Sequence, residues 1–234
     1  MNWLLDVGNT RIKLKIGNQE TIYGNTGDTD WLCRLRLSFP PKRVVISSVA
    51  NHEVHSELNF LFPNAEFPNA ETCQTFFNAD YYPLTTLGTD RYFAAWGASH
   101  LAKCPVLVVD AGTCMTLDWA DPIQGFQGGV ITPGFSMRIK SMHEGTGRLP
   151  NLDTRFISGE FSFPGHSTQE ALALGSIGAM ALEIQQLSSQ RTVFLCGGDA
   201  QLLANQLKTF NFEASVRLEP DLVLTGLSYY ANTP

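Results

Sequence analysis

The sequence predicts an α/β fold made of two similar halves, and a motif that occurs twice is the strongest sign of it. Residues 5–13 read LDVGNTRIK, and residues 109–116, about a hundred positions later, read VDAGTCMT. In both copies an apolar run ends in Asp, one residue separates that Asp from Gly, and hydroxyl or amide side chains follow before apolar residues resume. This is the layout of a strand, a tight turn and a second strand.

The order of the remaining elements is the second observation, because strand-like runs alternate with helical patterns in both halves. The expected strands are residues 3–7, 12–16, 21–23, 43–49, 105–109, 115–119, 128–131 and 192–196. A first helix is expected to end near Leu37 after a cap at Asp28 or Thr29. The other expected helices are residues 51–62, 88–102, 137–142, 169–187, 199–207 and 222–230. Short apolar runs such as 43–49 favour buried parallel strands.

On this basis the chain divides into an N-terminal half, residues 1–86, and a C-terminal half, residues 87–234. Each half carries one copy of the motif. Residues 63–86 are rich in Pro, Asn and Thr, and we expect them to form a connecting region. In a duplicated α/β architecture we expect a ligand in the cleft between the halves.

Length and composition are typical of a soluble globular protein. The 234 residues are 44% apolar, which allows a sizeable core, and no apolar run of about eighteen residues is present that could span a membrane. The formal charge is −6 and 16% of residues are charged, so no basic surface for nucleic acid or an anionic membrane is expected. The five cysteines form no CxxC pair, which is typical of reduced thiols in the cytosol.

The two motifs have the chemistry of a phosphate-binding turn. Glycine lets the backbone approach a ligand and adopts φ angles that other residues avoid, so the N–H groups of the turn can face a phosphate. Thr and Asn add neutral donors, and Arg11 or Lys13 can add positive charge. Asp6 and Asp110 would repel phosphate unless a cation, usually Mg²⁺, lay between carboxylate and phosphate. One Asp-x-Gly can equally be an ordinary hairpin turn, whereas two copies favour a phosphate clamp.

Five more short motifs accompany the two turns. Their sequences are GTDR at 88–91, GGVITPG at 128–134, LP at 149–150, GHST at 165–168 and CGGD at 196–199. Each is weak alone, but their joint order is highly specific and covers nearly the whole chain. In this order the chain resembles the type III pantothenate kinases, which belong to the actin-like, sugar-kinase-like group. The resemblance implies a duplicated ribonuclease-H-like (actin-like ATPase) fold.

The same resemblance implies an activity and its cofactors. The reaction is transfer of the γ-phosphoryl group of ATP to the primary hydroxyl of pantothenate, the first step of coenzyme A synthesis, with Mg²⁺ accompanying ATP. It also implies that Asp110 binds a monovalent cation, K⁺ or NH₄⁺, although the residues alone allow Mg²⁺ there as readily. Asp90 is the expected general base, because an ordinary Asp is already ionised near neutral pH. The family further implies a cytoplasmic homodimer.

Site residues carry over from the motifs position by position. Those expected to bind ATP are Asp6, Val7, Gly8, Asn9, Thr10, Arg11, Ile12, Lys13 and Thr113. Those expected to bind pantothenate are Tyr81, Gly88, Thr89, Asp90, Arg91 and Thr168. The guanidinium of Arg91 can fork onto the pantothenate carboxylate or onto a phosphate.

Some of these residues also have a purely structural interpretation. Thr168 precedes an apolar helix and could cap it, and residues 88–91 could simply begin a helix with Asp in its first turn. The pair Gly197 and Gly198 could let an adenine or ribose approach the backbone, or form an ordinary strand-to-helix turn.

Two other functions are compatible with the same fold. One is a kinase for another small alcohol, which should lack the combination of GxDR at 88–91 with Thr168. The other is a non-catalytic regulatory or interaction protein. Four residues argue against such a non-catalytic scaffold: Asp6, Lys13, Asp90 and Asp110.

Overall fold

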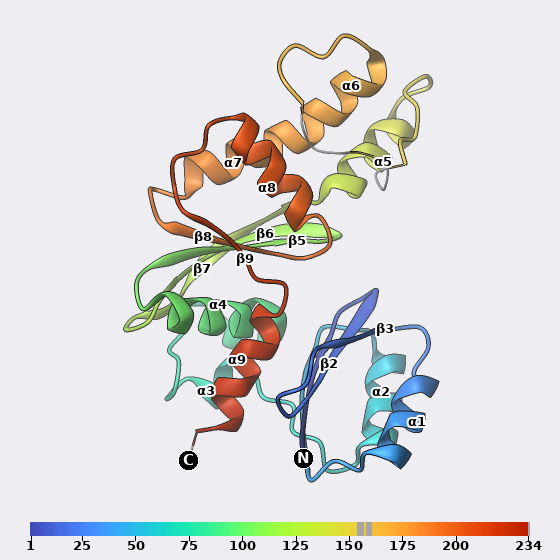
Figure 1. Ribbon diagram of the computed structural model, residues 1–234, viewed down its shortest axis with the longest axis vertical. Helices are drawn as coiled ribbons and strands as arrows, with labels where there is room; N and C mark the ends of the chain where they lie inside the picture. The colour runs from blue at the N-terminus through green and yellow to red at the C-terminus, as the bar shows by residue number, and fades with distance from the viewer. Residues whose placement is uncertain (154–156, 158–160, 234) are drawn as a thin grey trace. The chain divides into compact units, whose positions relative to one another are not determined.

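The computed structural model describes residues 1–153, 157 and 161–233, and within these it separates into two compact units (Figure 1). The first unit comprises Met1–Cys104, Ala120–Gly128 and the described chain from Asp221 onward. The second comprises Pro105–Trp119 and the described part of Gly129–Pro220. These units are defined by packing and differ from the predicted halves 1–86 and 87–234. The division at residue 86 therefore stays a prediction.

The first unit is built on a four-stranded sheet. Its strands are β1 (Asn2–Val7), β2 (Arg11–Ile16), β3 (Ile22–Asn25) and β4 (Arg43–Ser48). The spatial order is β3-β2-β1-β4, with β1 antiparallel to β2 and parallel to β4. The apolar runs predicted at 3–7, 12–16 and 43–49 are therefore strands, and the first motif is the hairpin between β1 and β2.

Side chains of β1 alternate between two faces of this sheet. Trp3, Leu5 and Val7 join the core formed with α1 (Asp30–Ser38) and α2 (His52–Leu61), which lie side by side in Figure 1. Because successive strand residues point to opposite faces, Asp6 lies on the other face. There α4 (Thr89–Ala102) contacts β4, and α9 (Leu222–Ala231) contacts β1, β2 and β4.

The helices α4 and α9 approach each other closely through glycine. A side chain at Gly226 would place its Cβ 2.0 Å from the carbonyl oxygen of Phe93, and one at Gly97 would lie 2.5 Å from that of Leu222. This close packing holds α4, which carries the GTDR motif at its start, within the first unit.

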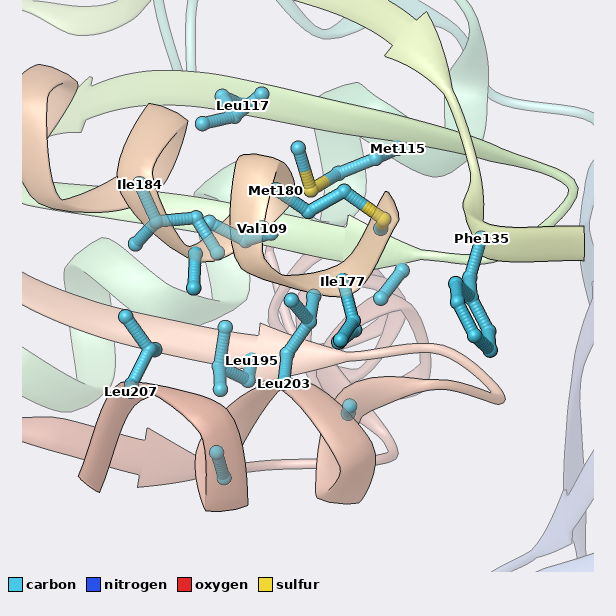
Figure 2. Close-up of a cluster of buried hydrophobic side chains, with 14 of the residues drawn as sticks. Val109, Met115, Leu117, Phe135, Ile177, Met180, Ile184, Leu195, Leu203 and Leu207 are labelled. Atoms are coloured by element: carbon cyan, nitrogen blue, oxygen red, sulfur yellow. The ribbon is translucent and has the colours of Figure 1, made fainter. Parts of the chain in front are cut away.

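The second unit contains helices and most of a five-stranded sheet, of which the segment Ala120–Gly128 belongs to the first unit. Its strands are β5 (Val106–Ala111), β6 (Cys114–Asp121), β7 (Gly125–Pro133), β8 (Thr192–Cys196) and β9 (Val216–Leu218), in the order β7-β6-β5-β8-β9. Its helices are α5 (Phe135–Gly145), α6 (Thr168–Ala173), α7 (Ala179–Leu187) and α8 (Ala200–Thr209), with a π-helical segment Leu174–Gly178 between α6 and α7. Figure 2 shows the buried apolar side chains that these strands and helices share.

The two sheets have equivalent strand orders, which confirms the predicted duplicated α/β fold. The order β3-β2-β1-β4 of the first sheet corresponds to β7-β6-β5-β8 of the second. The last two strands of each set, β1 with β4 and β5 with β8, are parallel. In the second sheet β9 continues beyond β8. At the equivalent place in the first unit, a single parallel bridge joins Val45 to Glu66.

Most differences from the predicted elements are short or lie at element ends. The strand β9 was not predicted, and neither were α3 (Ala70–Cys73) and the 3₁₀ turn Leu84–Thr86 within the connecting region. The helix α5 begins two residues earlier than expected, because Gly134 is its N-cap. Short elements depend on contacts with distant residues, which local patterns do not contain.

Candidate active site

The first turn is a hairpin closed by its own glycine. The N–H of Gly8 donates to the carbonyl of Arg11 at 2.9 Å, and the hydroxyl of Thr26 donates to the carbonyl of Gly8 at 2.8 Å. Asn9 and Thr10 at the tip are exposed. The φ angle of Gly8 is not positive, so this turn does not use the unusual backbone angle that glycine was expected to provide. The exposed tip leaves the side chains of Asn9 and Thr10 accessible to a ligand.

Asp6 lies in a polar row that crosses the first sheet. The register pairs Asp6 with Lys13 on β2, Lys13 with Tyr23 on β3, and Asp6 with Ser47 on β4. Directly opposite residues share one face of a sheet, so these four side chains lie on the same face. The Nζ of Lys13 is 3.4 Å from Oδ2 of Asp6. The sequence patterns did not indicate Ser47 or Tyr23 as neighbours of this pair.

The carboxyl of Asp6 is buried and its proton affinity is high. Burial raises the pKa of Asp6 from 3.8 to about 6, the charge of Lys13 opposes this rise, and the negative charge of Asp90 adds to it. Ser47, which lies opposite Asp6, has its hydroxyl 2.9 Å from that of Thr89, the residue before Asp90, so Asp6 and Asp90 belong to one neighbourhood of the first unit.

The GTDR motif forms the N-terminus of α4, which confirms the prediction that residues 88–91 begin a helix. Gly88 is the N-cap, and a side chain there would place its Cβ 2.6 Å from Oδ1 of Asp90. The same Oδ1 accepts from the backbone N–H of Arg91 at 2.7 Å, while the hydroxyl of Ser47 lies 2.9 Å from that of Thr89. Burial raises the pKa of Asp90, whereas the hydrogen bond from Arg91 opposes the rise.

Arg91 is buried against two aromatic rings. Its Cζ lies 5.7 Å from the ring centroid of Tyr81 and 5.6 Å from that of Phe126. The neighbouring Tyr82 is instead 96% exposed. The sequence did not indicate Phe126, which lies on β7, because the nearby GGVITPG motif begins two residues later at Gly128.

The second turn lies at the start of α5. The N–H of Gly112 donates to the carbonyl of Cys114 at 3.0 Å, and the N–H of Gly134 donates to that of Thr113 at 3.1 Å. A Cβ at Gly134 would lie 2.1 Å from the carbonyl oxygen of Gly112, so the GGVITPG motif ends in a glycine that this contact requires. Thr113 is exposed beside the N-terminus of α5.

Asp110 is the last residue but one of β5, and its carboxyl lies close to Gly197, which follows β8. Gly197 has φ +90°, and a Cβ there would lie 2.4 Å from both Oδ1 of Asp110 and the carbonyl oxygen of Ala111. A Cβ at Gly198 would meet nothing within 4 Å. The two glycines therefore differ: Gly197 permits a close approach within the protein, and Gly198 lies in open space.

Thr168 does not cap its helix. The N-cap of α6 is Ser167, whose hydroxyl accepts from the N–H of Glu170 at 3.1 Å, and Thr168 is the exposed first residue of the helix. The capping interpretation of Thr168 was wrong because the chain is already helical at Thr168, one residue earlier than a cap at this position would require. A cavity of about 540 Å³ lies beside it in the second unit, lined in part by Ser167, Gln169 and Asp153.

The predicted site residues fall into two groups. The first unit holds the β1–β2 turn, Asp90, Arg91 and Tyr81, and the second holds Asp110, Thr113 and Thr168. Among the described residues, no group of three or more His, Cys, Asp or Glu side chains is arranged to hold a metal ion. None of the described helices combines the length and the apolar character that crossing a membrane requires.

Solved structures of other proteins share this fold. A Campylobacter jejuni structure, described as a conserved Baf family transcriptional activator, aligns with a TM-score of 0.67 at 23% identity over 97% of this chain and 96% of its own. The activator of the 2-hydroxyisocaproyl-CoA dehydratase from Clostridium difficile, with bound ADPNP, aligns with a TM-score of 0.54 at 14% identity over 96% and 91%. At these identities the likeness shows the fold, which is that of the actin-like ATPases.

Sequence comparisons define the family within this fold. A family model described as type III pantothenate kinase matches residues 3–190. A type III pantothenate kinase from Phocaeicola vulgatus is 34% identical over 242 aligned residues, which cover 97% of this chain and 96% of the relative. The chain belongs to the type III pantothenate kinase family.

Proposed function

We propose that this protein transfers the γ-phosphoryl group of ATP to the primary hydroxyl of pantothenate, the first step of coenzyme A synthesis. Family membership supports the reaction. The observation that carries the proposal is the position of Asp90, at the N-terminus of α4 beside the guanidinium-bearing Arg91 and within electrostatic reach of Asp6. The residues proposed as the base, the anion-binding group and the phosphate-binding turn all belong to the first unit, which supports the proposal.

Asp90 is the general base in this proposal. Its carboxylate accepts the proton of the acceptor hydroxyl as a bond forms between that oxygen and the γ-phosphorus. The bond from the γ-phosphorus to the β,γ-bridging oxygen breaks, and ADP leaves. Catalysis of this kind consists mostly of alignment and charge stabilisation, so the fixed position of Asp90 matters more than its basicity.

The two turns bind ATP. Residues 6–13 supply Lys13 and the exposed Asn9 and Thr10, and Thr113 contributes from the second turn. The start of α5 beside Thr113 supports this role, because the N–H groups and dipole at a helix N-terminus favour phosphate. Mg²⁺ bound to ATP neutralises charge on the phosphates during transfer.

Asp110 holds a monovalent cation, K⁺ or NH₄⁺. The donor set fits such an ion, since the carboxylate of Asp110 and the carbonyl of Ala111 both face the space that a Cβ at Gly197 would fill. Oxygen donors of this kind suit hard cations. The cation supplies positive charge near the phosphates when it is bound.

Pantothenate contacts Arg91, Tyr81, Gly88, Thr89 and Thr168 in this proposal. The guanidinium of Arg91 takes the carboxylate, since a planar fork matches a carboxylate bidentately. The protein acts as a homodimer in the cytoplasm, which light scattering and cell fractionation test directly.

A coupled assay of ADP release tests the function. Purified protein with pantothenate, ATP, Mg²⁺ and K⁺ should release ADP at a rate that depends on pantothenate, and mass spectrometry should find 4'-phosphopantothenate. A folded protein that binds ATP but phosphorylates another alcohol and never pantothenate would overturn the substrate assignment. A folded protein without kinase activity towards any alcohol would favour the regulatory alternative.

A further inference from the structure

The guanidinium of Arg91 lies beside two aromatic rings that contact each other and come from distant parts of the sequence. Tyr81 precedes α4 and Phe126 lies on β7, and both rings are within 5.7 Å of the Arg91 Cζ. The two rings meet edge to face, with centroids 5.8 Å apart and planes at 71°. Phe126 is 0% exposed and Arg91 is 8% exposed, so the charge lies in a largely desolvated place.

A short parallel bridge fixes both rings at once. The N–H of Phe126 donates to the carbonyl of Asn78, and the N–H of Asp80 donates to that of Phe126, each at 2.8 Å. Gly125 makes the bridge possible, because it has φ +85° and a Cβ there would lie 1.9 Å from the carbonyl oxygen of Asn78. The backbone around Phe126 therefore sets the position of Tyr81 as well as that of its own ring.

Aromatic faces hold a guanidinium in a particular way. The ring quadrupole attracts the positive charge, most strongly where water is excluded. Two rings that are not parallel also restrict the guanidinium plane in two directions. Bidentate binding of a carboxylate depends on the direction of that plane.

We propose that Phe126 is a positioning residue that, together with Tyr81, orients the guanidinium of Arg91 to bind the carboxylate of the acceptor substrate. The role of Arg91 towards that carboxylate rests on the proposed function. Phe126 then contributes to the preference for an acceptor that ends in a carboxylate over one that ends in a neutral group. It contributes little to the transfer step at Asp90 or to the binding of ATP.

The test compares two acceptors in Phe126→Leu: pantothenate, and pantothenol, which has a neutral hydroxyl in place of the carboxylate. We expect the KM for pantothenate to rise by about threefold to tenfold, as the loss of one cation–π contact in a desolvated site predicts. The KM for pantothenol and the KM for ATP should stay within about twofold, and kcat for pantothenol should be retained. Phe126→Tyr, which keeps the ring, should restore the KM for pantothenate.

Phe77→Leu is the matched control for lost packing. Phe77 is 2% exposed in the same unit and stacks on Trp96. Its replacement should lower stability without changing the ratio of the two acceptor KM values. If the KM values for pantothenate and pantothenol rise equally in Phe126→Leu, Phe126 contributes only packing and the proposal is wrong. If only the KM for ATP changes, Arg91 binds a phosphate and not the carboxylate.

A measurement without catalysis separates this inference from the proposed function. In NMR spectra of the arginine side chains, the Arg91 resonances should carry ring-current shifts in the wild type and in Phe77→Leu. These shifts should move towards ordinary values in Phe126→Leu. Unchanged Arg91 resonances in Phe126→Leu would overturn the positioning role of Phe126. A wild-type protein that shows the ring-current shifts but does not phosphorylate pantothenate would overturn only the proposed substrate.

Discussion

Asp6 and Lys13 face each other in register across β1 and β2, with Nζ of Lys13 3.4 Å from Oδ2 of Asp6. The ion pair lies on the face of the sheet that α4 and α9 cover, where burial disfavours charge. Burial outweighs the attraction of Lys13, so the pKa of Asp6 is raised to about 6. The buried carboxylate of Asp6, which we propose binds ATP, thus costs the fold some stability at neutral pH.

The first prediction concerns Asp6→Asn and the pH dependence of stability. Below pH 3.8 Asp6 is protonated in both folded and unfolded chains, and as pH rises through about 6 the folded chain must also give up its proton. Wild type should therefore lose stability relative to Asp6→Asn over this interval, by up to about 3 kcal/mol. Urea unfolding of both proteins at several pH values measures the difference.

The exposed Glu20 supplies the control for this series. In Glu20→Gln the difference from wild type should change little with pH. A flat difference between Asp6→Asn and wild type across the same interval would mean that Asp6 is not destabilised by burial.

Asp90→Asn should remove turnover while leaving the fold in place. The amide oxygen of Asn can still accept from the N–H of Arg91, so the start of α4 is kept, but no base remains to take the proton. We expect kcat to fall by roughly 10²–10⁴-fold. The exposed Asp80 is the control, since Asp80→Asn should keep kcat near wild type. Near-normal turnover in Asp90→Asn would exclude Asp90 as the base.

The pH profile of the wild type gives an independent check on Asp90. The base acts when it is ionised, and burial raises the pKa of Asp90. The acid limb of kcat/KM should therefore lie at higher pH than an ordinary Asp would give. An acid limb at or below the usual range for Asp would contradict this environment.

The sequence predicted the fold well because its strongest signals are local and repeated. The strand run at 192–196 and the helices around 51–62 and 88–102 have clear periodicity or capping residues, and the structure places them there. The repeated turn indicated the duplication, which the equivalent sheet orders confirm.

The site was less predictable because its supporting contacts join distant segments. Ser47 lies next to Asp6 only through strand register, and Phe126 reaches Arg91 only through the bridge to residues 78–80. Gly197 could be recognised as a turn glycine, but its contact with Asp110 requires β5 and β8 to be neighbours. Such pairings depend on tertiary structure and leave no periodic pattern.

Gly197 and Gly198 should respond differently to alanine. A Cβ at Gly197 would collide with Asp110 and Ala111 at a φ of +90°, whereas one at Gly198 meets nothing within 4 Å. Gly197→Ala should lose about 2 kcal/mol or more of stability, and Gly198→Ala should unfold close to wild type. Thermal unfolding of the two variants compares them, and equal midpoints would refute the close contact.

The proposed cation requirement can be tested through Asp110. Replacing K⁺ with Na⁺ should depress the wild-type rate, because the oxygen donors at Asp110 and Ala111 are proposed to hold the larger ion. Asp110→Asn should have a low rate that responds little to K⁺. Initial rates across K⁺ concentrations at constant ionic strength measure this, and a wild-type rate that is indifferent to the ion would remove the cation from Asp110.

Ser167 and Thr168 allow the cap and the substrate contact to be separated. Ser167 accepts from the N–H of Glu170, so Ser167→Ala should cost about 1 kcal/mol of stability, while Asp at this position should retain the cap. Thr168 is exposed and makes no N-cap, so Thr168→Val should leave stability near wild type and raise the KM for pantothenate. Urea unfolding and acceptor kinetics on the same three variants decide between the roles. A stability loss in Thr168→Val with an unchanged KM would return Thr168 to a structural role, because a hydroxyl that binds only substrate contributes nothing to the folded state without it.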